Sequence, residues 1–278
     1  MSNLIETIER EIITAIDEDR LVLPTLPEAA LRIREVAQDE NANVGDLSRT
    51  ISNDAAISAR IIKVCNSPLL RASQPVENVK MAINRLGMAY SADLAVGLAM
   101  EQMFQATSDL IDRHMRENWE RSTEVAGICH MLAQTRTRLS PAQAMLAGLT
   151  YRIGVLPILR FAEEHDNMVR DAFTLDEVIE NLYPSLGERI LRAWDFSEEL
   201  CRVPAEHLNF DRDSEQIDFV DLVMVANLQT IKSADHSLNN LDKTQIPAFA
   251  KLGIDPNQPE DEDEDLSENM AAALAMLS

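Results

Sequence analysis

Glycine, aromatic residues and cysteine are all scarce in this chain. It has 8 glycines and 3 cysteines in 278 residues, and Phe, Trp and Tyr together make up 4%. No stretch alternates apolar and polar residues as a half-buried strand does, so the composition favours an all-α protein. The cysteines, Cys65, Cys129 and Cys201, are widely spaced and odd in number, which predicts buried free thiols rather than a zinc site or disulfides.

Positive charge is also in short supply. The chain has 25 Lys and Arg residues against 47 Asp and Glu residues, which gives a net charge of −22. Such a charge argues against general binding to nucleic-acid phosphates or to an anionic membrane surface. No signal peptide is recognisable, and no uninterrupted apolar run reaches the roughly 18 residues of a membrane-spanning helix. We therefore expect a cytoplasmic protein without a nucleic-acid or membrane partner.

Apolar residues recur with helical spacing along most of the chain. The segment from Asn3 to Ile16 predicts an amphipathic helix that packs on its own domain. Further helices are expected after Pro27, from Asn43, up to Pro68, from Pro75 to Gly87, over 89–104, from Trp119, from Ser140 and over 216–232. Thr174 and Ser185 each precede a glutamate by three residues, and these two capping boxes predict two short helices.

The composition changes near the carboxyl end. Two prolines precede an unbroken acidic run, 260–265, which predicts an extended or disordered linker. Residues 266–277 then place apolar side chains on one face of a predicted helix. The pattern leaves open whether this helix docks back on the bundle or binds a partner.

Three ordered segments carry a resemblance to a known family. They read LPTLPEAALRI from Leu23, NDAAISARIIKVCNSP from Asn53 and PVENVKMAINRLG from Pro75. Together they resemble the HDOD family of bacterial signalling modules, and the resemblance extends to about Lys232. It implies an all-helical amino-terminal subdomain over 21–108 and a helical subdomain over 109–254 related to the HD metal-dependent phosphohydrolases. The helix over 1–20 and the acidic linker with the last helix, 255–278, lie outside the resemblance.

The HD enzymes hold divalent metal with histidines and aspartates, and the bound metal turns water into a nucleophile against a phosphoester. Aligned on Ser122, the first metal-binding histidine is replaced by Arg121. Aligned on Gly148 and Gly154, the His-Asp pair is replaced by Tyr151 and Arg152, and the last aspartate by Asn227. An arginine cannot be deprotonated in a protein and so cannot ligate a cation. The alignment therefore predicts that the metal site is lost.

Two further polar positions complete the predicted pocket. Tyr183 takes the place of a histidine that usually begins its segment in the family, and His207 matches a segment that often carries histidine. The resemblance thus groups Arg121, Tyr151, Arg152, Tyr183, His207 and Asn227 in a vestigial HD pocket, with no catalytic residue, no metal ligand and no cofactor. Two alternatives stay open, since the arginines could pair with nearby acids and His207 could be a capping or solvent-facing residue.

Other histidines do not supply a metal site. His165 and Asp166 form a literal His-Asp dipeptide, but its acidic context predicts a solvated helix end. His130 lies nine residues after Arg121, which places it on the opposite side of the same helix.

The sequence favours a regulatory, non-catalytic signalling protein that acts through contacts with protein partners. The first alternative is an HD-type phosphohydrolase with altered metal ligands. The second is a sensor that binds an anionic metabolite or cyclic dinucleotide through the pocket arginines.

Overall fold

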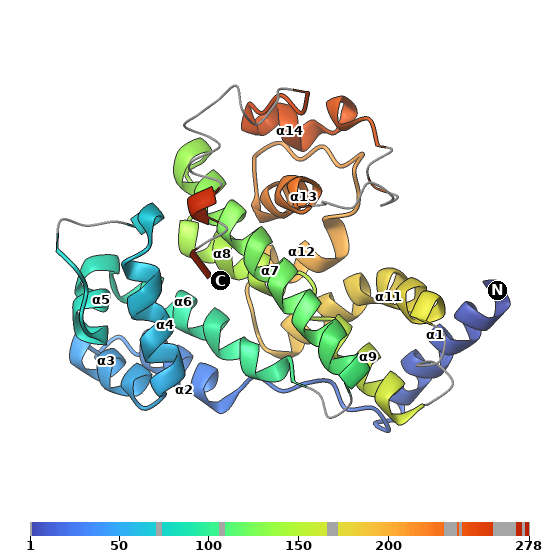
Figure 1. The fold of residues 1–278 in the computed structure, drawn as a ribbon, viewed down its shortest axis with the longest axis horizontal. Coiled ribbons are helices and arrows are strands. Elements are labelled where there is room, and N and C mark those ends of the chain that lie inside the picture. The colour runs from blue at the N-terminus through green and yellow to red at the C-terminus, as the bar shows by residue number, and fades with distance from the viewer. Residues whose placement is uncertain are drawn as a thin grey trace.

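The computed structural model describes residues 2–70, 74–105, 109–165, 172–230, 238, 241–257, 271–273 and 276–277. Within these residues every regular element is an α-helix or a short 3₁₀ helix, so the predicted all-α class is confirmed. Figure 1 shows the arrangement, with α2–α5 at one end of the molecule, α1 and α11 at the other, and α7 crossing the middle.

Among the residues that the structure describes, five α-helices form the amino-terminal part of the fold. In chain order they are α2 (Glu28–Gln38), α3 (Val44–Ser52), α4 (Ala55–Cys65), α5 (Val79–Leu86) and α6 (Met88–Ala99). Caps set several of these boundaries. Asn43 and Asp46 make the predicted capping box at the start of α3, and Gly87, with φ of +87°, separates α5 from α6. Helix α6 packs on both α2 and α8, so it joins the two parts of the molecule.

Helix α7 (Asp109–Arg136) is the longest element and the centre of the second part. It packs along α8 and also against α9 and α13. Gly148 on α8 makes the close crossing with α7 feasible, because an added Cβ would lie 2.4 Å from the Cα of Ala126. The other α-helices that the structure describes in this part are α8 (Pro141–Thr150), α9 (Val155–Glu164), α11 (Ala172–Ala193), α12 (Glu198–Glu206), α13 (Phe219–Gln229) and α14 (Pro247–Leu252).

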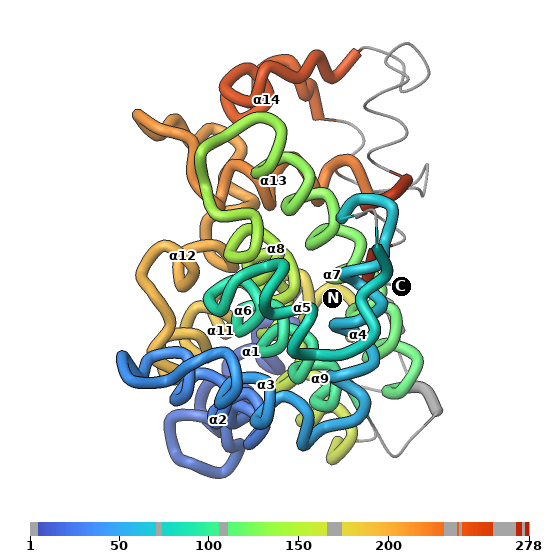
Figure 2. The backbone as a smooth tube through the Cα atoms, turned by 90° about the vertical axis from the view of Figure 1, so that its left-hand side faces the viewer, coloured from blue at the N-terminus to red at the C-terminus, as the bar shows by residue number. Residues whose placement is uncertain are grey.

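The amino-terminal helix α1 (Ser2–Asp17) packs within the chain, on α11. Its buried face includes Ile5, Ile8 and Ile12, and Arg189 of α11 donates a 2.9 Å hydrogen bond to Asp17. The tube view in Figure 2 shows the architecture from the left-hand side of Figure 1, with α13 and α14 lying above the bundle and the carboxyl end beside α7 and α4.

Several predicted boundaries are wrong. Helix α5 begins at Val79 rather than at Pro75, because Asn78 accepts a hydrogen bond from the N–H of Met81 and caps it. Helix α7 begins at Asp109, well before Trp119. The helix expected over 89–104 changes to a 3₁₀ turn at Met100. The helix expected over 216–232 covers only Phe219–Gln229, and its last two expected residues lie outside the described residues.

The two short helices expected at Thr174 and Ser185 are one continuous helix, α11. Ser185 does not cap a helix start, since its hydroxyl donates to the carbonyl oxygen of Leu182 at 3.1 Å. The apolar face of α11 stays buried along its length, as at Leu175, Leu186 and Ile190, and packing against α9 and α12 holds the helix together. Tertiary packing therefore overrides the local capping signals.

A single cluster of buried apolar side chains includes residues from all four predicted segments, among them Ile12, Ile61, Leu149 and Leu277. The segment boundaries at residues 20, 108 and 254 therefore stay predictions. By length and composition the stretch Pro141–Glu164 could cross a membrane, but 94% of its most apolar 18-residue window is buried inside the fold. Its apolar surface serves as core.

Candidate functional site

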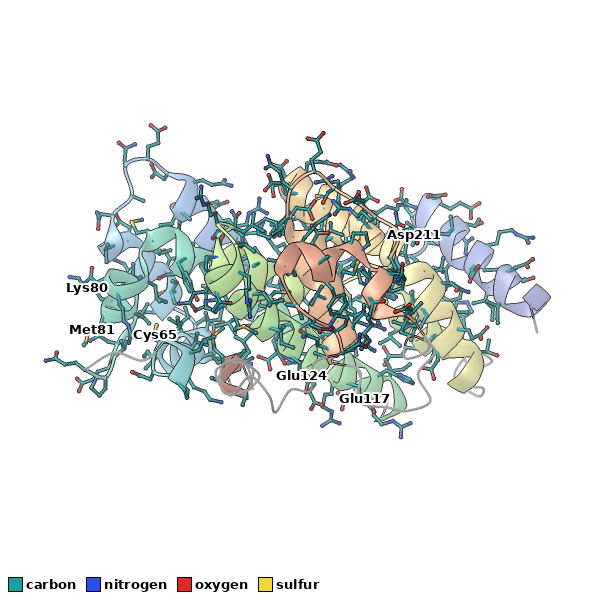
Figure 3. All side chains as sticks on the ribbon, turned by 90° about the horizontal axis from the view of Figure 1, so that it is seen from above. Cys65, Lys80, Met81, Glu117, Glu124 and Asp211 are labelled. Carbon is teal, nitrogen blue, oxygen red and sulfur yellow. The ribbon has the colours of Figure 1, made fainter. Side chains whose placement is uncertain are left out.

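The structure brings all six predicted pocket residues into one connected set of contacts. They come from α7, from the turn between α8 and α9, and from α11, α12 and α13. Five of the six are fully or almost fully buried, and the sixth, Arg121, is half-buried. In chain order they are Arg121, Tyr151, Arg152, Tyr183, His207 and Asn227. Figure 3 shows Glu117 and Glu124 along the outer edge of α7, the helix that also carries Arg121.

Asn227 accepts two hydrogen bonds at the position where the resemblance expects a metal-binding aspartate. Its Oδ1 lies 3.0 Å from Nη2 of Arg121 and 3.2 Å from the hydroxyl of Tyr151. Both Asn227 and Tyr151 are buried. A neutral carboxamide oxygen can accept both bonds, so the arrangement is satisfied without a cation.

Three side chains contact the guanidinium of Arg152. Its Nε donates to Oδ1 of Asn118 and its Nη2 donates to Oε1 of Glu180, each at 2.7 Å. The guanidinium carbon also lies 4.2 Å from the centre of the Tyr183 ring. Burial disfavours the charge of Arg152, but Tyr183 and Glu180 outweigh that effect, so the pKa of the guanidinium is raised. For Arg152, pairing with a nearby acid is therefore what the structure shows, whereas Arg121 donates to Asn227.

His207 is a neutral, fully buried residue in this network. It follows α12 as its carboxyl-terminal cap, and its Nδ1 lies 3.1 and 2.9 Å from the carbonyl oxygens of Val203 and Pro204. Nδ1 must carry the proton in such contacts, so Nε2 accepts the 2.9 Å hydrogen bond from Tyr183. Burial lowers the pKa of His207 to about 4. His207 caps a helix, but it does not face solvent.

The residues of the pocket do not fit a divalent metal. Two guanidinium groups lie among the contacts. Nε2 of His207, the ring nitrogen without a proton, already accepts a hydrogen bond from Tyr183. Over the part of the chain that the structure describes, no group of three or more His, Cys, Asp or Glu side chains could hold a metal ion. A cation placed here would meet fixed positive charge and too few acceptors.

His165 and His130 lie outside the pocket. His165 ends α9, is exposed, and stacks on Phe161, while Asp166 lies outside the described residues. His130 is buried and its Nε2 lies 2.6 Å from the hydroxyl of Tyr90, on the side of α7 that faces α6. Neither contributes to the pocket. All three cysteines are free and buried, as predicted.

Sequence reasoning missed two members of the network, Asn118 and Glu180. A weak signal for each is present, because Asn118 precedes Arg121 by three residues on α7 and Glu180 precedes Tyr183 by three on α11. Residues at that spacing share a helix face. The contact of both with Arg152 could be found only from the three-dimensional arrangement.

The two buried tyrosines provide a matched pair of substitutions. Tyr183→Phe leaves Nε2 of His207 without its donor, and we expect it to lower the free energy of unfolding by about 1–3 kcal/mol. Tyr151→Phe removes one of two donors to Asn227, which keeps its bond from Arg121, so the expected loss is below about 1 kcal/mol. Urea unfolding of the two variants measures the difference. Equal losses would show that the tyrosine hydroxyl does not hold His207.

A family model described as the HDOD domain matches residues 23–210. Among solved structures, a protein of Shewanella amazonensis SB2B named "Putative metal-dependent phosphohydrolase" is similar along its whole length. The two chains are 30% identical with 100% of each covered, and the TM-score is 0.89.

Two other solved structures share the fold at lower identity. An HDOD domain protein with unknown function from Geobacter sulfurreducens is 19% identical over 99% of each chain, with a TM-score of 0.63. A "Putative signal transduction protein" from Marinobacter aquaeolei VT8 is 20% identical, over 98% of this chain and 65% of that one, with a TM-score of 0.62. An uncharacterized protein of Treponema pallidum is 19% identical over 77% of this chain. The match covers 43% of the length of that relative.

Proposed function

Because this chain belongs to the HDOD family, related to the HD phosphohydrolases, we propose that it is a non-catalytic regulatory protein that acts through contacts with protein partners. The observation that carries the proposal is the filled pocket. Arg121 and Tyr151 share the oxygen of Asn227, and Arg152 is fixed by Asn118 and Glu180. The side chains use the space and the acceptors that a catalytic metal would need.

The same contacts disfavour the sensor alternative. A phosphate or carboxylate ligand needs free guanidinium N–H groups. Arg152 already donates to two side chains and lies against the ring of Tyr183, with 4% of its surface exposed. An anion would have to displace Glu180 to reach this fork. The proposal therefore assigns the arginines to holding the helices of the second part together.

Hydrolysis assays test the proposal. We expect the purified wild-type protein, with Mn²⁺, Ni²⁺ or Mg²⁺ added, to turn over phosphomonoesters and phosphodiesters no faster than a matched Arg152→Met variant. The variant keeps the length of the side chain but removes the guanidinium. Metal-dependent turnover that is present in the wild type and lost in the variant would replace the regulatory proposal with an HD-type hydrolase.

A further inference from the structure

The carboxyl-terminal residues that the structure describes, 271–273 and 276–277, are helical and docked on the bundle. Ala273, Met276 and Leu277 are 0%, 1% and 2% exposed. Figures 1 and 2 both place this end of the chain beside α7, near α4. Of the two options that the sequence left open, docking on the bundle is the one observed.

Gly127 in the middle of α7 is fitted to this docked segment. A Cβ added at Gly127 would lie 2.2 Å from the carbonyl oxygen of Ala273 and 2.7 Å from its carbonyl carbon. Glycine in a helix interior costs about 0.5–1 kcal/mol relative to alanine. At Gly127 the missing side chain lets the backbone of the last segment pack directly against the backbone of α7.

Arg60 on α4 holds the other end of the segment. Its Nη2 donates a 2.9 Å hydrogen bond to the carbonyl oxygen of Leu277, and its Nη1 is paired with Glu101. Donors and positive charge are favourable at the open carbonyls of a helix end. Arg60 belongs to the amino-terminal part and Gly127 to the second part, so the docked segment spans both.

We propose that the surface formed around Arg60 and Gly127 is a binding site for a short helix, and that the carboxyl-terminal segment is its resident intramolecular ligand through residues 271–273 and 276–277. This surface fits a partner helix with an alanine against Gly127 and apolar side chains three and four residues later. The helix also directs an open carbonyl toward Arg60. When such a partner replaces the resident segment, its binding changes the contact between the amino-terminal part and the second part. This inference deepens the proposed regulatory function and rests on it for the partner, but not for the site.

The resident segment is covalently linked to the bundle, and this link gives the segment an advantage over any free competitor. Residues 258–270, which include the acidic run, link it to the bundle, so it competes at an effective concentration on the order of millimolar. A free peptide of the same sequence is therefore excluded from the wild-type protein and admitted once the resident segment is displaced.

The test uses a fluorescent synthetic peptide of residues 266–278 and the full-length chain. Met276→Asp with Leu277→Asp places two charges in the buried part of the resident segment and displaces it. We expect this double variant to bind the peptide at least about tenfold more tightly than the wild type does, by fluorescence anisotropy. Adding Gly127→Ala to the double variant closes the site and abolishes binding.

Hydrogen exchange provides a second readout. Gly127→Ala alone removes an interior glycine, so the variant stays folded, but exchange over residues 271–277 rises to that of an undocked segment. A folded double variant that does not bind the peptide, or a Gly127→Ala chain with an unchanged, protected segment, overturns the proposal. These outcomes are separate from the hydrolysis assays, so failure here does not count against the regulatory function.

Discussion

Gly154→Ala is expected to lower the free energy of unfolding by about 3 kcal/mol, the upper range for overpacking a core. Gly154 precedes α9 with φ of −64°, a conformation that alanine adopts freely, so the cost is steric. An added Cβ would lie 2.1 Å from the carbonyl oxygen of Tyr183 and 2.5 Å from the backbone nitrogen of Gly187. Neither backbone atom can move without shifting α11.

Gly97→Ala is the matched control for this prediction. Its added Cβ also meets a close neighbour, the Cδ1 of Leu149 at 2.5 Å, but that atom is the end of a flexible side chain. We expect a loss of about 1 kcal/mol or less there. Urea denaturation of the two variants gives the comparison. If Gly154→Ala were as stable as the wild type, the close packing of α11 on this turn, and with it the position of Tyr183, would be wrong.

Acidification from pH 7 to pH 4 is expected to destabilise the fold by several kcal/mol. Burial lowers the pKa of both His207 and His130 to about 4. In the unfolded chain histidine titrates near about 6.5, so the unfolded state binds more protons between these values. The contribution of each histidine is therefore complete above about pH 6.5 and is lost as the pH falls toward 4, to a maximum of roughly 3 kcal/mol each.

Asp93 acts in the opposite direction over part of this range. Burial raises its pKa to about 6, so the native state binds more protons than the unfolded state between its ordinary value and 6, and acidification there offsets some of the loss. Urea unfolding at a series of pH values measures the sum. His207→Gln should flatten the profile between pH 6.5 and 4. A wild-type profile without any slope would mean that the buried histidines are not held neutral.

The family resemblance placed six pocket residues in the sequence, but their contacts depend on four helices and a turn. Local signals identified helix starts where one cap dominates, as at Asn43 and Ser140. They failed where signals compete, as at Pro75, which precedes the stronger cap of Asn78. The role of Gly127 could not be read from the sequence at all, because its neighbour Ala273 is distant in the chain.

We propose that Arg121, Tyr151, Arg152 and Asn227 fill the positions at which the HD enzymes hold their metal. A titration with Mn²⁺ followed by electron paramagnetic resonance tests it most directly, since bound Mn²⁺ loses the sharp signal of the hydrated ion. A variant that combines Arg121→His, Tyr151→His, Arg152→Asp and Asn227→Asp rebuilds the metal ligands as a comparison. We expect the wild-type protein to leave the Mn²⁺ signal unchanged at stoichiometric metal. A stoichiometric loss of the signal with the wild type would contradict it.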